Sequence, residues 1–162
     1  MTIRPVEVAD RERIQEILIS TARFTEDEIV CAVELVDLTI AKGAKSDYEV
    51  IVVEETDGEE TQVQGYVCYG ATPLTDGVFD LYWIAVDPLR QGHGLGQLLL
   101  RFVETEVRKA NGRMLLIETS SKESYQPTVR FYNQSGYEEI SRIKDFYRVE
   151  DDKVIFCKKL RA

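Results

Sequence analysis

The sequence predicts an α+β fold with a mixed, mostly antiparallel sheet flanked by helices. Segments that alternate apolar and polar residues are interleaved with segments of helical periodicity along all 162 residues. The Asp57-Gly58 dipeptide lies between two apolar runs and is typical of a tight hairpin turn, hence of antiparallel strands. From residue 78 onward a strand, a glycine-rich loop, a helix and another strand follow one another, an order that makes two strands parallel.

The first half of the chain is expected to hold two helices and the start of the sheet. Apolar residues recur at helical spacing between residues 10 and 20. A second helix is predicted over residues 25–41, because Thr25 and Glu28 form a capping box and Gly43 supplies a stop signal. Strands are predicted at Thr2–Val6, Tyr48–Glu54 and Val63–Tyr69.

The second half begins with a strand over Val78–Val86, which must end at Asp87-Pro88 because proline cannot donate to a strand ladder. A helix with one apolar stripe follows the glycines and ends at Asn111-Gly112. Met114–Ile117 is a continuous apolar run, as expected of a strand covered on both faces. The remaining predictions are a helix from Pro127 to Gly136 and strands at Glu138–Lys144 and Lys153–Lys159, with Asp145, Phe146 and Tyr147 between those strands.

Length and composition indicate one soluble domain, residues 1–162, with 44% apolar and 30% charged residues and no repeat or linker. The N-terminus lacks the apolar segment of a signal peptide, and no apolar stretch reaches membrane-spanning length. We therefore expect a cytoplasmic protein without a membrane partner. The net charge of −9 argues against a nucleic-acid partner, because phosphate binding needs clustered Lys and Arg.

The three cysteines, Cys31, Cys68 and Cys157, are widely spaced and form no C-x-x-C pair, so neither a disulfide framework nor a zinc site is predicted. We expect them to be small buried side chains, and we expect no metal. His93 is the only histidine and lies among glycines, which disfavours a Cys–His nucleophile.

The charges are distributed unevenly along the chain. Residues 24–60 hold 12 acidic and two basic residues, whereas residues 88–113 hold five basic and two acidic residues. A locally basic segment in an acidic protein suits a phosphate ligand. The alternative is that both segments are solvated faces.

The loop Gln91-Gly92-His93-Gly94-Leu95-Gly96 lies between a predicted strand and a predicted helix. Glycines let backbone N–H groups converge on an anion, and a helix N-terminus adds the positive end of its dipole. A dinucleotide-binding loop needs a third glycine where Gln97 stands, although Glu118 lies about where a ribose-binding acid would. No Gly-Lys-Ser or Gly-Lys-Thr follows, which excludes a P-loop.

Two motifs resemble the GNAT acyltransferase superfamily over essentially the whole chain. The pyrophosphate motif of that family (Gln or Arg, two residues, Gly, one residue, Gly or Ala) matches Gln91 to Gly96, after the strand that ends at Val86-Asp87-Pro88. Its second element, an aromatic-Tyr pair followed by Gly and an aromatic residue, matches Phe131-Tyr132 and Gly136-Tyr137. The resemblance implies that the central parallel strand pair splays apart to admit acetyl-CoA.

Carried over by position, the resemblance implies that the backbone of Ile84, Ala85 and Val86 pairs with the pantetheine arm and polarises the thioester carbonyl. The loop from Gln91 to Gly96 would bind the pyrophosphate. Tyr132 would protonate the departing CoA thiolate, and its ordinary pKa near 10 suits a general acid. The alternative is that Tyr132 only fills space on the apolar face of its helix.

The general base is harder to assign from the resemblance. Asp80 occupies the strand position where some relatives carry a catalytic Glu, but its side chain is one methylene shorter, so it would act through water. The alternative is a solvated residue at the start of a strand. Glu118 is a second candidate for the catalytic base, and Tyr125 stands where many relatives have a cofactor-contacting Asn.

Three classes of function fit the sequence to different degrees. The leading one is an N-acetyltransferase that moves an acetyl group from acetyl-CoA to a primary amine by direct attack in a ternary complex. The others are a non-catalytic acyl-CoA-binding module and a nucleotide-dependent enzyme. The acceptor would be a small-molecule or peptide amine, cationic if the acidic segment lines its pocket. By analogy with the family, Phe146 and Tyr147 are expected to border that pocket, and a homodimer is left open.

Overall fold

The structure is a computed structural model and describes residues 1–161. In this part of the chain the strands form a seven-stranded sheet with the order β1-β2-β3-β4-β5-β7-β6. Only the β4–β5 pairing is parallel among the pairings recorded for these residues, which confirms the predicted mixed, mostly antiparallel α+β fold. The chain divides into two compact units: unit 1 comprises residues 1–70 and 82–103, and unit 2 comprises residues 71–81 and those from Glu104 onward.

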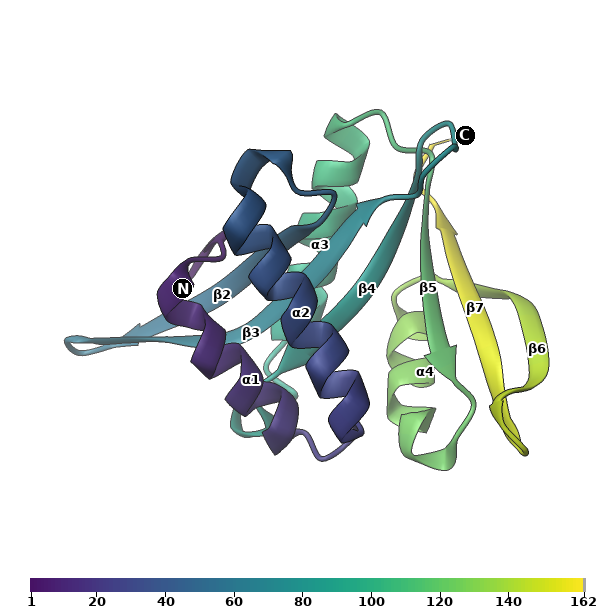
Figure 1. Cartoon of the computed structure of the whole chain (residues 1–162), viewed down its shortest axis with the longest axis horizontal. Coiled ribbons are helices and arrows are strands. Elements are labelled where there is room, and N and C mark those ends of the chain that lie inside the picture. The colour runs from purple at the N-terminus through teal and green to yellow at the C-terminus, as the bar shows by residue number, and fades with distance from the viewer. Residues whose placement is uncertain (162) are drawn as a thin grey trace. The chain divides into compact units, whose positions relative to one another are not determined.

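Unit 1 packs two helices against one face of its strands (Figure 1). Its core joins Ile14 and Leu18 of the first helix to Val36 of the second and to Tyr66 and Cys68 of the sheet, all of them fully buried. The periodic apolar residues predicted the helices correctly. The elements are β1 (Thr2–Pro5), α1 (Arg11–Ser20), α2 (Glu26–Lys42), β2 (Glu49–Asp57), β3 (Glu60–Ala71) and the end of β4 (Val78–Val86).

Helix α2 ends where the sequence predicted. Thr25 accepts from the Glu28 backbone N–H at 3.2 Å, and the Glu28 carboxylate accepts from the Thr25 N–H at 2.7 Å, which completes the capping box. Gly43 caps the other end with a φ of 52°. Short 3-10 turns cover Val8–Asp10, Gly43–Lys45, Pro88–Arg90 and Glu123–Tyr125.

Helix α3 (Leu95–Lys109) begins in unit 1 and continues into unit 2, whereas β4 begins in unit 2 and ends in unit 1. In unit 1 it packs closely on β3, because a Cβ added to Gly65 would lie 3.4 Å from Leu99 and 2.9 Å from the Ala85 carbonyl. The absence of a side chain at Gly65 therefore permits the close approach of β3, β4 and the first turns of α3. Among residues 1–161, no helix is both long and apolar enough to cross a membrane.

Unit 2 places α4 (Gln126–Gln134) beside β5 (Met114–Ser120) and β7 (Asp151–Lys159), while β6 (Glu138–Arg148) pairs with β7 and is exposed along its length. The parallel register of β4 and β5 runs from Val78 opposite Met114 to Leu81 opposite Ile117. The Tyr132 ring of α4 lies 5.9 Å from the ring of Phe156 on β7, so α4 covers the face that Phe156 and its partner Ile117 share.

Two predicted loops differ from the structure. The β2–β3 turn is Gly58-Glu59 rather than Asp57-Gly58, because Asp57 still pairs with Glu60 and Gly58 supplies the φ of 63° that the turn needs. The residues Asp145, Phe146 and Tyr147 belong to β6 and not to a loop, since the hairpin continues until Arg148 pairs with Asp151.

Two burial predictions were wrong. In β5 only alternate residues of the apolar run, Leu115 and Ile117, are fully buried, and Leu116 is half-buried. In unit 2, α4 and the last turns of α3 contact the face of the sheet that carries Leu115 and Ile117, and Leu116 lies on the other face. Cys31 is exposed on α2, whereas Cys68 and Cys157 are buried as expected.

Candidate functional site

The loop after β4 starts with a fixed turn. The Asp87 carboxylate accepts from the Leu89 N–H at 2.8 Å, and Pro88 opens a single 3-10 turn. Gln91 reaches back to donate from Nε2 to the Val86 carbonyl at 3.2 Å. The end of the strand and the start of the glycine loop are thus held by three local contacts.

A fourth contact comes from α1 and was missed by sequence reasoning. The Arg13 guanidinium pairs with the Asp87 carboxylate through Nη2 and donates from Nε to the Val63 carbonyl at 3.1 Å. Asp87 is buried, so this cation offsets the cost of desolvating its charge. The two residues lie 74 positions apart, and no local pattern links them.

The two glycines of the loop have the backbone conformation that the motif requires. Gly92 and Gly94 have φ angles of 79° and 83°, and a Cβ added to either would meet nothing within 4 Å. The loop is therefore open on the side of both glycines. The Leu98 N–H donates to the Gly94 carbonyl at 2.9 Å, while His93 Nδ1 lies 3.1 Å from the Gln91 carbonyl.

Helix α3 begins at Leu95, whose side chain is buried and anchors the first turn, and Gly96 is its second residue. The first backbone N–H groups of a helix have no acceptor within the helix and carry its positive dipole end. An open glycine loop followed at once by a helix N-terminus fits a pyrophosphate group. The residues present therefore suit the ligand that the motif predicts.

The strand residues predicted to contact pantetheine lie just before this loop. Ala85 is buried, while Ile84 and Val86 are half-buried. All nine residues predicted to bind the cofactor belong to unit 1, and the structure brings them into one continuous strand–loop–helix segment, residues 84–96.

Tyr132 lies in an aromatic cluster of unit 2 and is only 3% exposed. Its ring is 5.4 Å from that of Phe131, 6.0 Å from that of Tyr137 and 5.9 Å from that of Phe156. Burial, with a smaller contribution from Tyr125, raises the pKa of Tyr132 above its ordinary value of 10. The hydroxyl therefore keeps its proton throughout the neutral range.

The ring of Tyr137 is itself held by a buried ion pair. The Tyr137 hydroxyl donates to Glu104 at 3.1 Å, and Lys158 donates to both oxygens of the same carboxylate at 2.9 and 3.0 Å. Lys158 also donates to the Ser135 carbonyl at 2.9 Å. This network holds the C-terminal end of α4 at Ser135 and the ring of Tyr137. Because the Tyr137 ring packs against Tyr132, the network limits the rotation of the Tyr132 ring.

The two candidate bases each have a polar partner. The Asp80 carboxylate accepts from the Thr72 hydroxyl at 2.5 Å, and Glu118 Oε2 lies 2.7 Å from Lys153 Nζ. Neither partner was predicted from the sequence, because Lys153 reaches Glu118 only through the β5–β7 pairing.

The register of unit 2 places Asp80 and Glu118 on the same face of the sheet. Asp80 lies opposite Leu116, and Leu116 and Glu118 share a face because they are two residues apart in β5. Tyr132 contacts the other face, through Phe156. The predicted acid and the predicted bases thus lie on opposite sides of the unit 2 sheet.

A hollow of about 470 Å³ lies in unit 1 near the β2–β3 hairpin. None of the predicted site residues is among the described residues that line it. Its lining combines acidic and amide side chains with one arginine: Met1, Glu55, Thr56, Asp57, Glu60, Gln62, Gln64 and Arg90.

Comparison with known proteins agrees with this geometry. Residues 46–139, more than half of the chain, match the model of the acetyltransferase (GNAT) domain. A crystal structure of a protein assigned to the GNAT acetyltransferases, from Desulfovibrio desulfuricans, is 41% identical, with a TM-score of 0.92 over 98% of both chains. The chain therefore belongs to the GNAT family and is an acetyltransferase. Among curated proteins, none matches the chain.

More distant solved structures share the fold. An aminoglycoside 6'-N-acetyltransferase in complex with coenzyme A is 13% identical, with a TM-score of 0.74 over 100% of this chain and 98% of the other. A Salmonella typhimurium protein, yncA, solved with acetyl-CoA, is 22% identical, with a TM-score of 0.74 over 100% of this chain and 95% of the other.

Proposed function

We propose that this acetyltransferase moves the acetyl group of acetyl-CoA to a primary amine by direct attack in a ternary complex. The observation that carries the proposal is the open glycine loop at the start of α3, directly after β4. Two structures of the same fold hold coenzyme A or acetyl-CoA, which supports the choice of ligand.

In this proposal the segment 84–96 binds the cofactor. Backbone N–H groups of Gly92, Gly94 and the first turn of α3 bind the pyrophosphate, and Arg13 keeps Asp87 and the loop entrance in place. Backbone groups of Ile84, Ala85 and Val86 pair with the pantetheine arm, and one of their N–H groups stabilises the oxyanion. When bound, acetyl-CoA supplies the thioester carbon that the amine attacks.

Tyr132 donates a hydrogen bond and then its proton to the departing thiolate. Its raised pKa ensures that the proton is present at neutral pH, but it weakens Tyr132 as an acid relative to a thiol with a pKa near 8.5. Partial transfer in the transition state is the main contribution expected of such a group.

Removal of the amine proton is assigned to the opposite face of the unit 2 sheet. Asp80, held by Thr72, accepts the proton through water, and Glu118 is the second candidate base. Because the predicted acid and bases are on different faces, proton donation to the thiolate and proton removal from the amine use separate groups.

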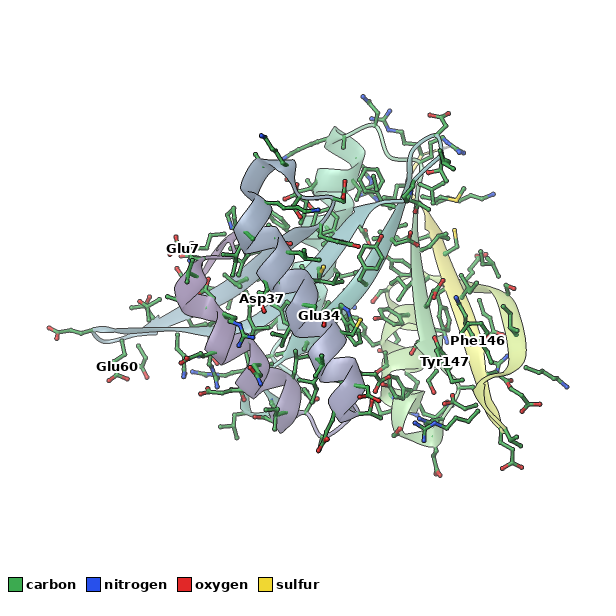
Figure 2. The ribbon with its side chains drawn as sticks, viewed as in Figure 1. Glu7, Glu34, Asp37, Glu60, Phe146 and Tyr147 are labelled. Carbon is green, nitrogen blue, oxygen red and sulfur yellow. The ribbon has the colours of Figure 1, made fainter. Side chains whose placement is uncertain are left out.

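The acceptor is proposed to be a cationic amine, either a small molecule or a peptide. Support comes from the acidic segment, of which Glu34 and Asp37 lie along α2 and Glu60 lies at the hairpin end (Figure 2). Part of that charge is already paired, since Asp37 binds Arg11 and Glu54 binds Arg4. The aminoglycoside specificity of two fold neighbours agrees with a cationic acceptor. A cytoplasmic location and a homodimer remain predictions.

A turnover assay tests the proposal. Acetyl-CoA is incubated with a panel of polyamines, aminoglycosides, amino-acid amines and peptides, and free thiol is followed. We expect amine-dependent thiol release with a KM that rises with ionic strength. Binding of acetyl-CoA without thiol release for any amine would instead indicate a non-catalytic acyl-CoA-binding module.

A further inference from the structure

Lys153 joins three strands of unit 2. From β7 its Nζ reaches Glu118 Oε2 on β5 at 2.7 Å and lies 4.8 Å from the centroid of the Phe146 ring on β6. The lysine side chain is only 16% exposed, whereas that of Glu118 is 48% exposed. The ammonium is thus the enclosed member of the cluster, and the carboxylate is the open one.

The β5–β7 register puts this cluster on the face that carries Asp80. Ile155 lies opposite Glu118 and Lys153 lies opposite Ser120, so Lys153 and Glu118 are diagonal neighbours on one face. Asp80 is on the same face through its pairing with Leu116. This face therefore carries the carboxylates of Asp80 and Glu118 as well as the ammonium group of Lys153.

Phe146 is held so that its ring can meet Lys153. Asp145, directly before it, has a φ of 51°, and its backbone N–H donates to Asp152 at 3.0 Å. The Tyr147 ring packs edge-on against that of Phe146, with centroids 5.0 Å apart. Figure 2 shows both aromatic residues on β6. A ring in this place favours a cation above its face and keeps the lysine from turning away.

The chemistry of the cluster favours orientation over stability. Ion pairs with one exposed partner contribute little to folding, because water screens them. Lys153 occupies one carboxylate oxygen of Glu118, and the exposure of Glu118 leaves the side chain accessible to a ligand.

We propose that Lys153 is a positioning residue for the acceptor: it holds the Glu118 carboxylate in one orientation, in which Glu118 binds the incoming amine as a fixed anion. Phe146 in turn holds Lys153. This inference rests on the proposed function and assigns Glu118 to acceptor binding, with proton removal left to Asp80 and water.

Steady-state kinetics at saturating acetyl-CoA, with the best amine of the panel varied, test the inference. We expect Lys153→Met to raise the acceptor KM about three- to ten-fold with kcat changed less than about two-fold. Lys153→Arg should have a KM close to that of the wild type, because a guanidinium can contact both the Glu118 carboxylate and the Phe146 ring. Lys159→Met is the matched control: Lys159 is exposed on the same strand, so the same loss of charge should leave KM unchanged.

The double variant Lys153→Met/Glu118→Gln tests whether Lys153 affects the acceptor KM through Glu118. Once Glu118 is neutral, removing Lys153 should add no further increase in KM. Phe146→Leu should raise the acceptor KM by a smaller factor. This variant also tests the inference if Lys153→Met fails to fold.

Three results would overturn the inference. Lys153→Met could match the wild type, it could raise KM equally in both Glu118 backgrounds, or Glu118→Gln could lower kcat with no change in KM. In each case the wild type is active, so the proposed function stands. If the wild type acetylates no amine, the proposed function fails and the inference fails with it.

Discussion

At the residue scale, Tyr132 has two roles in this account: its ring packs in the aromatic cluster, and its hydroxyl is proposed to protonate the departing CoA thiolate. Tyr132→Phe keeps the ring and removes only the hydroxyl. We predict that kcat falls about ten- to a thousand-fold while the dissociation constant of acetyl-CoA changes little, because general acid catalysis is worth roughly 10²–10⁴-fold and water replaces part of it. Stopped-flow kinetics and calorimetry provide the two values. Wild-type turnover under conditions where chemistry limits kcat would make Tyr132 a packing residue only.

Tyr66 gives a second prediction at this scale, on stability. Its hydroxyl is fully buried on β3 and has no hydrogen-bond partner among the described residues, and burial raises its pKa. An unsatisfied buried hydroxyl costs about 1–3 kcal/mol, so Tyr66→Phe should leave the free energy of unfolding unchanged or raise it by about 1 kcal/mol. Urea denaturation at pH 7 measures this.

Tyr137→Phe is the matched control for Tyr66→Phe, because Tyr137 donates to the buried Glu104. Removing that donor should lower the free energy of unfolding by about 1–2 kcal/mol. If Tyr66→Phe is as destabilising as Tyr137→Phe, then Tyr66 has a partner, such as a buried water, that satisfies it.

At the element scale, the strand–loop–helix segment predicts selective binding of CoA. Gly94→Val should abolish the thermal shift caused by CoA, because the new side chain would fill the open side of the loop, and its φ of 83° is strained for valine. Gly58→Val is the matched control: Gly58 has a φ of 63° and open surroundings, but it lies in the β2–β3 turn.

Both variants should lose stability by about 1–2 kcal/mol, and only Gly58→Val should keep the CoA shift. NAD should stabilise neither the variants nor the wild type. A shift with NAD alone would contradict the assignment of the loop to CoA.

Local signals explain why most elements could be predicted. The capping box of α2, the proline after β4 and the glycines before α3 each act within a few residues, so the sequence displays them directly. The end of β6 could not be predicted in the same way, because Asp145 stays in the strand through hydrogen bonds with Glu150 and Asp152 of the hairpin.

The candidate site also combines local and distant features. The segment proposed to bind the cofactor, residues 84–96, is continuous in the sequence, so its motif could be read there, whereas the partners of Asp87 and Glu118 come from distant parts of the chain. Arg13 and Asp87 are 74 positions apart, and Lys153 and Glu118 lie on different strands, so the tertiary fold brings each pair together. The periodicity of apolar residues does not predict which distant side chains pair, so the orientation of the candidate bases could be determined only from the structure.

At the scale of the whole molecule, we propose that the two compact units unfold as one domain. Both β4 and α3 run through unit 1 and unit 2, so neither unit can unfold without disrupting elements of the other. Scanning calorimetry should show one transition with equal calorimetric and van't Hoff enthalpies. Two separated transitions, or a calorimetric enthalpy well above the van't Hoff enthalpy, would contradict the single-domain prediction.

The central claim is that an amine attacks the acetyl group directly, without an acetylated enzyme intermediate. The most direct measurement mixes the protein with isotopically labelled acetyl-CoA, with and without an amine acceptor, and follows the label by mass spectrometry on the time scale of one turnover. We predict labelled acetyl-amine and stoichiometric free CoA only when the amine is present, with no transient label on the protein. A burst of free CoA without amine, together with a labelled side chain that passes its acetyl group to the amine, would contradict the account.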